Sequence, residues 1–214
     1  MSFVIEECTD ADMPRAFELL SVAFGHEHPY IESVFPDHES AEGRRIGGER
    51  LLEFRQADPF ATNIKAVDPK TGKMVGHARW IICDGALAPE FELSGDYWET
   101  DDQKEFAAWM YSQYLVPRRE AIKNSGGHIV SLDLMTVAPE YQRQGIGRAL
   151  LEWGLAVADR LGVEAVVEAT DYGLGLYRSA GYEVQYKYKV KMPEKWAERE
   201  TQQFWWMVRP KQAS

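Results

Sequence analysis

The segment from Gly127 to Ala169 restricts the possible folds of this chain more than any other. It begins with the apolar run GHIVSLDLMTV, continues through the turn APEYQRQGIG, and ends with the apolar run VEAVVEA. Between the two runs, apolar residues recur at helical spacing from Ile146 to Leu161, and Gly162 can end the helix. The segment therefore predicts a strand, an amphipathic helix and a second strand.

The rest of the chain shows the same mixture of patterns. Strands are predicted at 3–9, 60–67, 74–83, 184–192 and 202–210, and helices at 11–24, 41–58, 102–124 and 173–183. We expect Pro117 to kink or end the helix that contains it. The order predicts one α+β domain spanning 1–214, with a central mixed sheet flanked by helices and an insertion at about 84–127.

Composition argues against several classes of protein. The 34 acidic and 24 basic residues give a net charge of -10 without a Lys/Arg run, so no nucleic-acid partner is expected. No segment approaches the roughly 20 apolar residues that cross a bilayer, and the start lacks a signal-peptide pattern. Cys8 and Cys83 have no metal or redox spacing. We therefore expect a cytoplasmic protein that does not bind membranes.

Two glycines at the start of the central helix need an explanation. Glycine costs about 1 kcal/mol relative to alanine in a helix, yet Gly145 and Gly147 stand at the strand-to-helix turn. The free amides of a first helical turn bind anions, and glycine lets a ligand approach them closely. Arg143 and Arg148 add positive charge. A phosphate or diphosphate is the predicted ligand.

Nucleotide fingerprints fit this turn poorly. A dinucleotide site needs G-x-G-x-x-G, but Leu150 stands at the third glycine position. No Gly-Lys-Ser/Thr sequence follows the turn either, which a mononucleotide P-loop requires. A nucleotide-binding protein remains a hypothesis that rests on the glycine-rich turn alone.

Two motifs in order resemble the GNAT superfamily of N-acetyltransferases. The first is Gln142-x-x-Gly145-x-Gly147, and the second is Leu-Tyr-x-x-x-Gly-aromatic, beginning at Leu176. The resemblance implies a mostly antiparallel sheet that is splayed between its fourth and fifth strands, with acetyl-CoA as cosubstrate. The insertion, together with the ARW of the preceding strand, resembles a branch often seen in fungi.

The resemblance also implies roles for particular residues. Main-chain groups of the strand pair with the pantetheine arm, the turn holds the diphosphate, and Tyr177 protonates the departing thiolate. The residues expected to bind acetyl-CoA are Met135, Thr136, Val137, Gln142, Arg143, Gln144, Gly145, Ile146, Gly147, Arg148 and Asp171.

The base that deprotonates the amine is harder to assign. The glutamate that many family members carry on this strand aligns with Ser131, a poor base. Strand alternation would place Ser131, Asp133, Met135 and Val137 on one face, so Asp133 is the expected catalytic base, directly or through water. Glu168 and His77 are alternatives, and a water chain without a single base is another.

Three histidines lie close together near the first predicted helix. His26, His28 and His38 could suggest a metal site, but they meet no firm ligand pattern, so no metal is expected. We interpret this segment as a lip that faces the acceptor substrate.

Together these features predict an acyltransferase that moves an acetyl group from acetyl-CoA to a primary amine by direct attack in a ternary complex. The acceptor could be a small molecule or a peptidyl amine. The alternative is a non-catalytic acyl-CoA-binding or sensing module on the same fold, which the serine at position 131 motivates. A monomer and a homodimer both remain open, because the segment FWWMV is either a sheet edge or a dimer contact.

Overall fold

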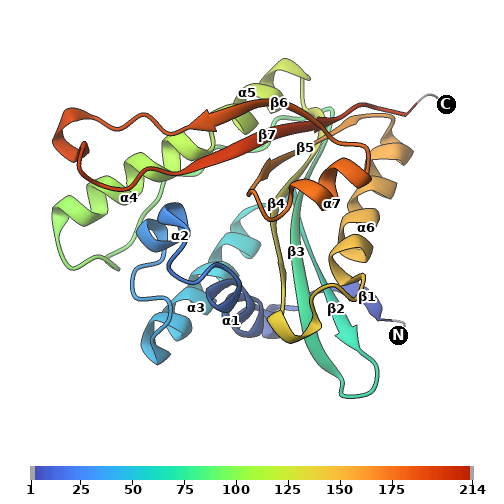
Figure 1. Ribbon diagram of the computed structural model, residues 1–214, viewed down its shortest axis with the longest axis horizontal. Helices are drawn as coiled ribbons and strands as arrows, with labels where there is room; N and C mark the ends of the chain where they lie inside the picture. Colours follow the sequence, from blue (N-terminus) through green and yellow to red (C-terminus); the bar gives the residue numbers. More distant parts are fainter. Residues whose placement is uncertain (1–2, 213–214) are drawn as a thin grey trace.

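The strand segments assemble into one seven-stranded sheet in the order β1-β2-β3-β4-β5-β7-β6. We describe the protein from a computed structural model, which covers residues 3–212 (Figure 1). The strands are β1 (Val4–Glu7), β2 (Ala61–Asp68), β3 (Lys73–Asp84), β4 (His128–Val137), β5 (Glu164–Ala169), β6 (Glu183–Lys189) and β7 (Gln203–Arg209). Neighbouring strands are antiparallel except β4 and β5, which are parallel. The predicted α+β fold with a mixed, mostly antiparallel sheet is confirmed.

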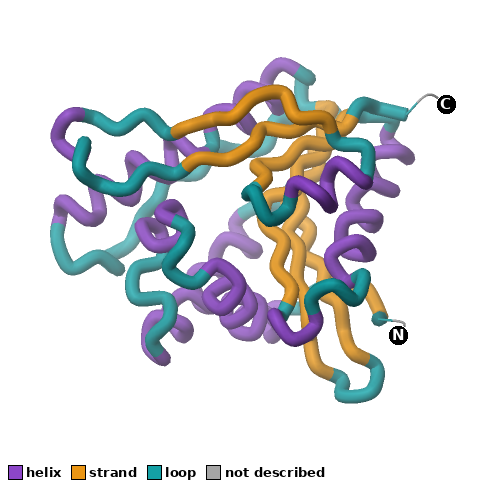
Figure 2. The backbone as a smooth tube through the Cα atoms, viewed as in Figure 1, coloured by secondary structure: helices purple, strands orange, loops and turns teal. Residues whose placement is uncertain are grey.

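Helices cover both faces of this sheet (Figure 2). They are α1 (Met13–Phe24), α2 (Pro29–Val34), α3 (Ala41–Ala57), α4 (Asp101–Tyr114), α5 (Val116–Asn124), α6 (Ile146–Leu161) and α7 (Leu174–Ser179). The helix α6 packs on one face of β2, β3 and β4, and α1 and α3 pack on the other. As expected, the helix that contains Pro117 is interrupted, since α4 ends and α5 begins just before that proline. Within residues 3–212, no helix combines the length and the apolar character needed to span a bilayer.

Close packing explains several glycines inside helices. A Cβ at Gly47 of α3 would lie 2.0 Å from the ring of Phe17, and one at Gly154 of α6 would lie 2.2 Å from the indole of Trp80. Both aromatic side chains are completely buried. These glycines therefore let helices lie close to large core residues, which offsets their low helix propensity.

The sheet opens between β4 and β5. The two strands pair only from Ile129 to Leu132 of β4, although β4 continues to Val137. On its other edge, β5 pairs with β7 from Ala165 to Ala169, so its last two residues, Glu168 and Ala169, pair with β7 but not with β4. The splay between the fourth and fifth strands that the family resemblance implied is present.

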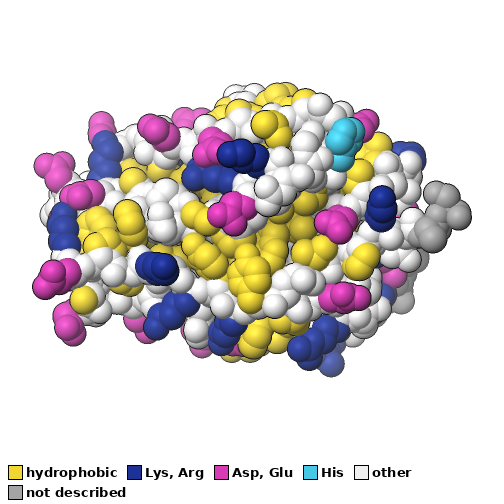
Figure 3. Space-filling model, turned by 90° about the horizontal axis from the view of Figure 1, so that it is seen from above, with side chains coloured by type: hydrophobic (Ala, Val, Ile, Leu, Met, Phe, Trp, Pro, Cys, Tyr) yellow, Lys and Arg dark blue, Asp and Glu magenta, His cyan; other side chains and the backbone are white. Residues whose placement is uncertain are grey.

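The C-terminal segment corrects one expectation. The strand β7, which contains FWWMV, lies between β5 and β6 and is therefore not a sheet edge. The edge strand on this side of the sheet is β6, which carries the exposed Tyr186. Figure 3 shows hydrophobic side chains gathered in the middle of the upper face of the molecule, with charged side chains around them.

Candidate active site

A cleft of about 1540 Å3 opens at the splay. Its walls come from β4, β5, α7 and the turn before α6, and from α1, α2, α4 and α5. Single-ligand pockets are typically about 300–1,000 Å3, so this cleft has room for two substrates. All the predicted site residues line it except Gln144, whose side chain turns back and donates to the carbonyl of Glu140.

The turn before α6 presents a row of free backbone amides. Among the described residues, no acceptor pairs with the amides from Arg143 to Arg148, and the first bond of the helix runs from Ala149 to the Gly145 carbonyl at 3.0 Å. Positive φ angles of 60° at Arg143 and 90° at Gly145 curl the chain at this point. Such a turn forms a concave anion site, and its open surface at Gly145 fits a diphosphate.

We expect Gly145→Ala to weaken CoA binding at least about tenfold, because alanine resists the positive φ that aims these amides. Gly72→Ala is a matched control, since Gly72 also has positive φ (67°) and open space but lies in the β2–β3 turn. Calorimetric titration with CoA checks this expectation. Equal affinities in the two variants would contradict it.

The polar side chains around the turn have several partners. Arg148 donates to the Ser179 hydroxyl at 2.5 Å, and the Gln142 amide donates to the Val137 carbonyl at 3.2 Å. Asp171 accepts a hydrogen bond from the Trp205 indole at 2.6 Å. The structure thus brings these residues to one end of the cleft, and their roles in binding acetyl-CoA stay predictions.

A free strand edge lies next to the turn. Beyond Leu132, β4 is paired with β3 on one side and with no strand on the side of β5. Its unpaired backbone groups, from Asp133 to Val137, line the cleft. An extended ligand can pair with such an edge as an added strand.

A β-bulge at Asp133 changes the expected alternation of side chains. Leu132 pairs with Trp80 and Leu134 with Arg79, so Asp133 has no partner on β3. As a result, Met135 and Val137 pack with the cluster under α6. The two residues that flank Ser131, Val130 and Leu132, belong to that same cluster, so the Ser131 side chain lies on the opposite face of the strand. The prediction that all four residues share one face is wrong, because an extra residue shifts the two-residue period by one.

Five charged side chains form a chain of ion pairs across the splay. Arg79 on β3 contacts Asp58 at 2.7 Å and Asp133 at 2.5 Å. Arg118 on α5 contacts Asp133 and also binds Glu168 on β5, with 3.0 Å between Nε and Oε1. All five line the cleft. Three carboxylates against two guanidinium groups leave a net charge of −1 in this network.

The pKa values of the two central carboxylates of the network, Asp133 and Glu168, are shifted in opposite directions. Burial raises the pKa of Asp133, but Arg118 and Arg79 outweigh burial and hold this pKa well below its usual range. For Glu168, burial dominates and raises the pKa despite Arg118. Asp133 is therefore the weaker proton acceptor of the two near neutral pH.

Tyr177 lies on α7, on the other side of the splay from β4. Its ring packs edge-on against Tyr182, with centroids 5.7 Å apart, and a Cβ at Gly173 would come within 2.5 Å of it. Among the residues of the described range, none hydrogen-bonds the Tyr177 hydroxyl. Burial, with a contribution from Glu168, raises its pKa above the usual value. Tyr177 is therefore a protonated phenol whose donor is free to meet a ligand in the cleft.

The alternative base His77 lies outside the cleft, and so does Ser131, which stands at the position of the family glutamate. His77 is completely buried, with its Nε2 3.0 Å from the side-chain oxygen of Asn63. Ser131 is also completely buried. Neither lines the cleft, so neither can reach an amine there.

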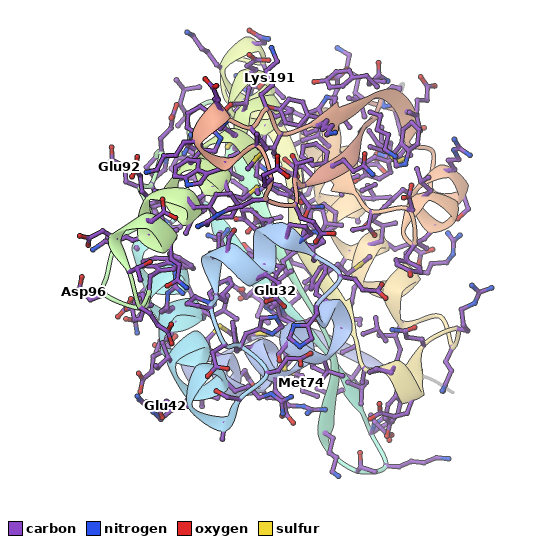
Figure 4. The ribbon with its side chains drawn as sticks, turned by 60° about the vertical axis from the view of Figure 1, so that its left-hand side comes forward. Glu32, Glu42, Met74, Glu92, Asp96 and Lys191 are labelled. Atoms are coloured by element: carbon purple, nitrogen blue, oxygen red, sulfur yellow. The ribbon has the colours of Figure 1, made fainter. Side chains whose placement is uncertain are left out.

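Two of the three histidines of the lip share a glutamate, and the third packs against an aromatic ring. His26 lies 2.7 Å from Glu32 and from Glu39, and His38 lies 3.0 Å from Glu32. Glu32 extends from α2 (Figure 4). His28 instead packs against Phe24, with centroids 4.8 Å apart. In the described part of the chain, no three His, Cys, Asp or Glu side chains are placed to hold a metal ion.

Two buried histidines predict a pH-dependent stability. Burial lowers the pKa of His28 to about 4, and burial with Arg79 lowers that of His77 to about 3. A histidine in the unfolded chain has a pKa of about 6.5, so below that pH the unfolded state binds more protons than the native state. Stability is then complete above this pH and falls as pH drops, by about 2 kcal/mol per histidine at about pH 5.

The free energy of unfolding, measured with urea at about pH 7 and at about pH 5, checks the prediction. His77→Gln is expected to remove about half of the loss seen between neutral and mildly acidic pH. His26, whose raised pKa changes stability in the opposite direction, contributes equally to both proteins, so its effect cancels in the comparison. An unchanged loss in His77→Gln would contradict this assignment.

Comparisons with known proteins agree with this geometry. Residues 100–184 match the model of the acetyltransferase (GNAT) domain. No curated protein matches the chain in sequence.

Among solved structures, the chain is similar to histone acetyltransferase HPA2 and related acetyltransferase from Corynebacterium glutamicum, with 20% identity, a TM-score of 0.63, and 100% of this chain and 99% of that chain covered. It is also similar to mosquito arylalkylamine N-acetyltransferase like 5b, with 15% identity, a TM-score of 0.63, and 97% and 99% covered. A phosphinothricin acetyltransferase from Sinorhizobium meliloti, solved with AcCoA, gives 16% identity, a TM-score of 0.56, and 99% and 89% covered. At these identities the likeness shows the fold alone. The acceptors named for these three proteins differ from one another.

Proposed function

We propose that the protein transfers an acetyl group from acetyl-CoA to a primary amine, on the premise that residues 100–184 match the GNAT acetyltransferase domain. The observation that carries this proposal is the row of unpartnered amides from Arg143 to Arg148, next to the free edge of β4 and across the splay from Tyr177. The turn would hold the diphosphate, and Met135, Thr136 and Val137 the pantetheine arm. Acetyl-CoA supplies the activated acetyl group, and the proposed location is the cytoplasm.

Tyr177 is proposed as the general acid. Its raised pKa keeps the phenol protonated near neutral pH, and its hydroxyl is free to donate. A phenol placed beside the sulfur can supply the proton that the leaving thiolate needs as the carbon–sulfur bond breaks.

The ion-pair network is proposed to receive the amine. Its net charge of −1 favours an ammonium group beside Asp133 and Glu168. Asp133 is suited to orient and stabilise that group, whereas the raised pKa of Glu168 makes it the better acceptor of the amine proton, through a water molecule. The amine then forms the carbon–nitrogen bond in a ternary complex, and its second proton replaces the one that Tyr177 gives up.

The alternative is a module that binds acyl-CoA without turnover. The low pKa of Asp133 favours this alternative, because a carboxylate tied to two arginines is a weak base. The two functions share the cosubstrate site and differ only in chemistry at the splay.

Release of free thiol from acetyl-CoA in the presence of a panel of amines tests the proposal. Thiol release that depends on the amine is expected. CoA binding by calorimetry without release for any amine would support the module instead, and absence of CoA binding would contradict both.

A further inference from the structure

The end of the cleft beyond the ion-pair network has an aromatic wall. Its members come from the end of α1, from the start of α2 and from α4: Phe24, His28, Tyr30, Tyr111 and Tyr114. Tyr30 stacks on Tyr114 with ring centroids 4.1 Å apart and on Tyr111 at 6.4 Å. All of this wall thus belongs to segments outside the two sequence motifs, and it can shape the site for a specific acceptor.

This wall carries no charge. Burial lowers the pKa of His28 to about 4, so its imidazole is neutral, and its Nδ1 is buried without a hydrogen-bond partner among the described residues. Burial raises the pKa values of Tyr30 and Tyr114 well above normal, so both stay phenols. The wall offers aromatic faces and a few neutral polar atoms, and these suit an apolar body more than an ionic one.

The ion-pair network next to the wall suits a cation more than an anion. The buried cations that line the cleft, Arg79 and Arg118, are both held by carboxylates. Arg119, less deeply placed, pairs with Glu90 at 3.3 Å. A carboxylate on the acceptor would therefore meet a site of net negative charge whose buried cations are already paired.

We propose that the acceptor is a primary monoamine on an apolar, preferably aromatic, body, without a carboxylate and without a second ammonium group. This inference rests on the proposed acetyltransferase function. The ammonium group lies toward Asp133 and Glu168, and the body packs on Tyr30, Tyr111 and Tyr114. A second ammonium group would have to be desolvated among neutral side chains, which is unfavourable.

Matched amines test this inference on the unmodified protein with saturating acetyl-CoA. 2-Phenylethylamine is expected to exceed phenylalanine in kcat/KM at least about 100-fold, because the two differ only by the carboxylate. Hexylamine is expected to exceed 1,6-diaminohexane at least about tenfold. Turnover of phenylalanine or of the diamine at a rate equal to that of its partner would overturn the inference while leaving the acetyltransferase function intact.

A substitution in the aromatic wall tests whether the wall binds the body of the acceptor. Tyr111→Leu is expected to raise the KM for 2-phenylethylamine about tenfold with little change in kcat, and to affect hexylamine less. Tyr186→Leu, on the edge strand β6 outside the cleft, is the control and should change neither value. Calorimetric titration of 2-phenylethylamine into the CoA-saturated protein gives a readout without turnover. Unchanged affinity in Tyr111→Leu would overturn the placement, and failure of CoA itself to bind would contradict the underlying function.

Discussion

Tyr177→Phe is expected to lower kcat at least about 100-fold while leaving the affinity for CoA unchanged. The substitution removes only the hydroxyl oxygen, which has no hydrogen-bond partner among the residues from 3 to 212, so folding loses little. The reaction, in contrast, loses the proton donor proposed for the leaving thiolate. Initial rates of thiol release, with CoA affinity measured by calorimetry, separate the two effects.

Tyr182→Phe is the matched control for this substitution. Tyr182 packs against Tyr177 and its hydroxyl also has no partner in the described structure, but it does not line the cleft. We expect this variant to keep the full rate. Equal rates for Tyr177→Phe and the unsubstituted protein would remove Tyr177 from the proposed chemistry.

Arg118→Met is expected to destabilise the protein by about 3–5 kcal/mol. The guanidinium group is buried and is the shared partner of Asp133 and Glu168, so its loss leaves the buried Glu168 and the partly buried Asp133 with one remaining cation, Arg79. The pKa of Asp133 is expected to rise as well, because Arg118 is the largest influence that lowers it. Urea unfolding at neutral pH measures the loss, and Arg118→Lys, which keeps the charge, should recover part of it.

Lys104→Met provides the comparison at the surface. Lys104 pairs with Asp96 at 2.9 Å, but Asp96 is almost fully exposed and extends outward from the molecule (Figure 4). Solvent screens such pairs, so the unfolding midpoint should stay unchanged. If Arg118→Met cost no more than Lys104→Met, the network would not be a buried, mutually dependent set of charges.

The order of helices and strands could be predicted because it depends on local periodicity. The helical spacing from Ile146 to Leu161 and the apolar run of β4 each encode their own structure. The glycines of the turn also carried a local signal, since their poor helix propensity required a compensating ligand or contact. The helix α3 was recognisable despite Gly47, although its reason, contact with Phe17, is visible only in three dimensions.

The charge network could not be predicted because its members meet only in the folded chain. Asp58, Arg79, Asp133, Arg118 and Glu168 come from five separate segments. Arg79, Asp133 and Glu168, which are charged residues inside apolar strands, were local hints of buried partners, but nothing local said which residues pair. The bulge at Asp133 gave no such hint, and a single inserted residue was enough to reverse the faces assigned to Met135 and Val137.

The position of acetyl-CoA in crystals of the complex tests the central claim most directly. We predict diphosphate oxygens within about 2.7–3.2 Å of amide nitrogens between Arg143 and Arg148, and a thioester beside the Tyr177 hydroxyl. A diphosphate bound away from this turn, or a thioester out of reach of Tyr177, would contradict the account.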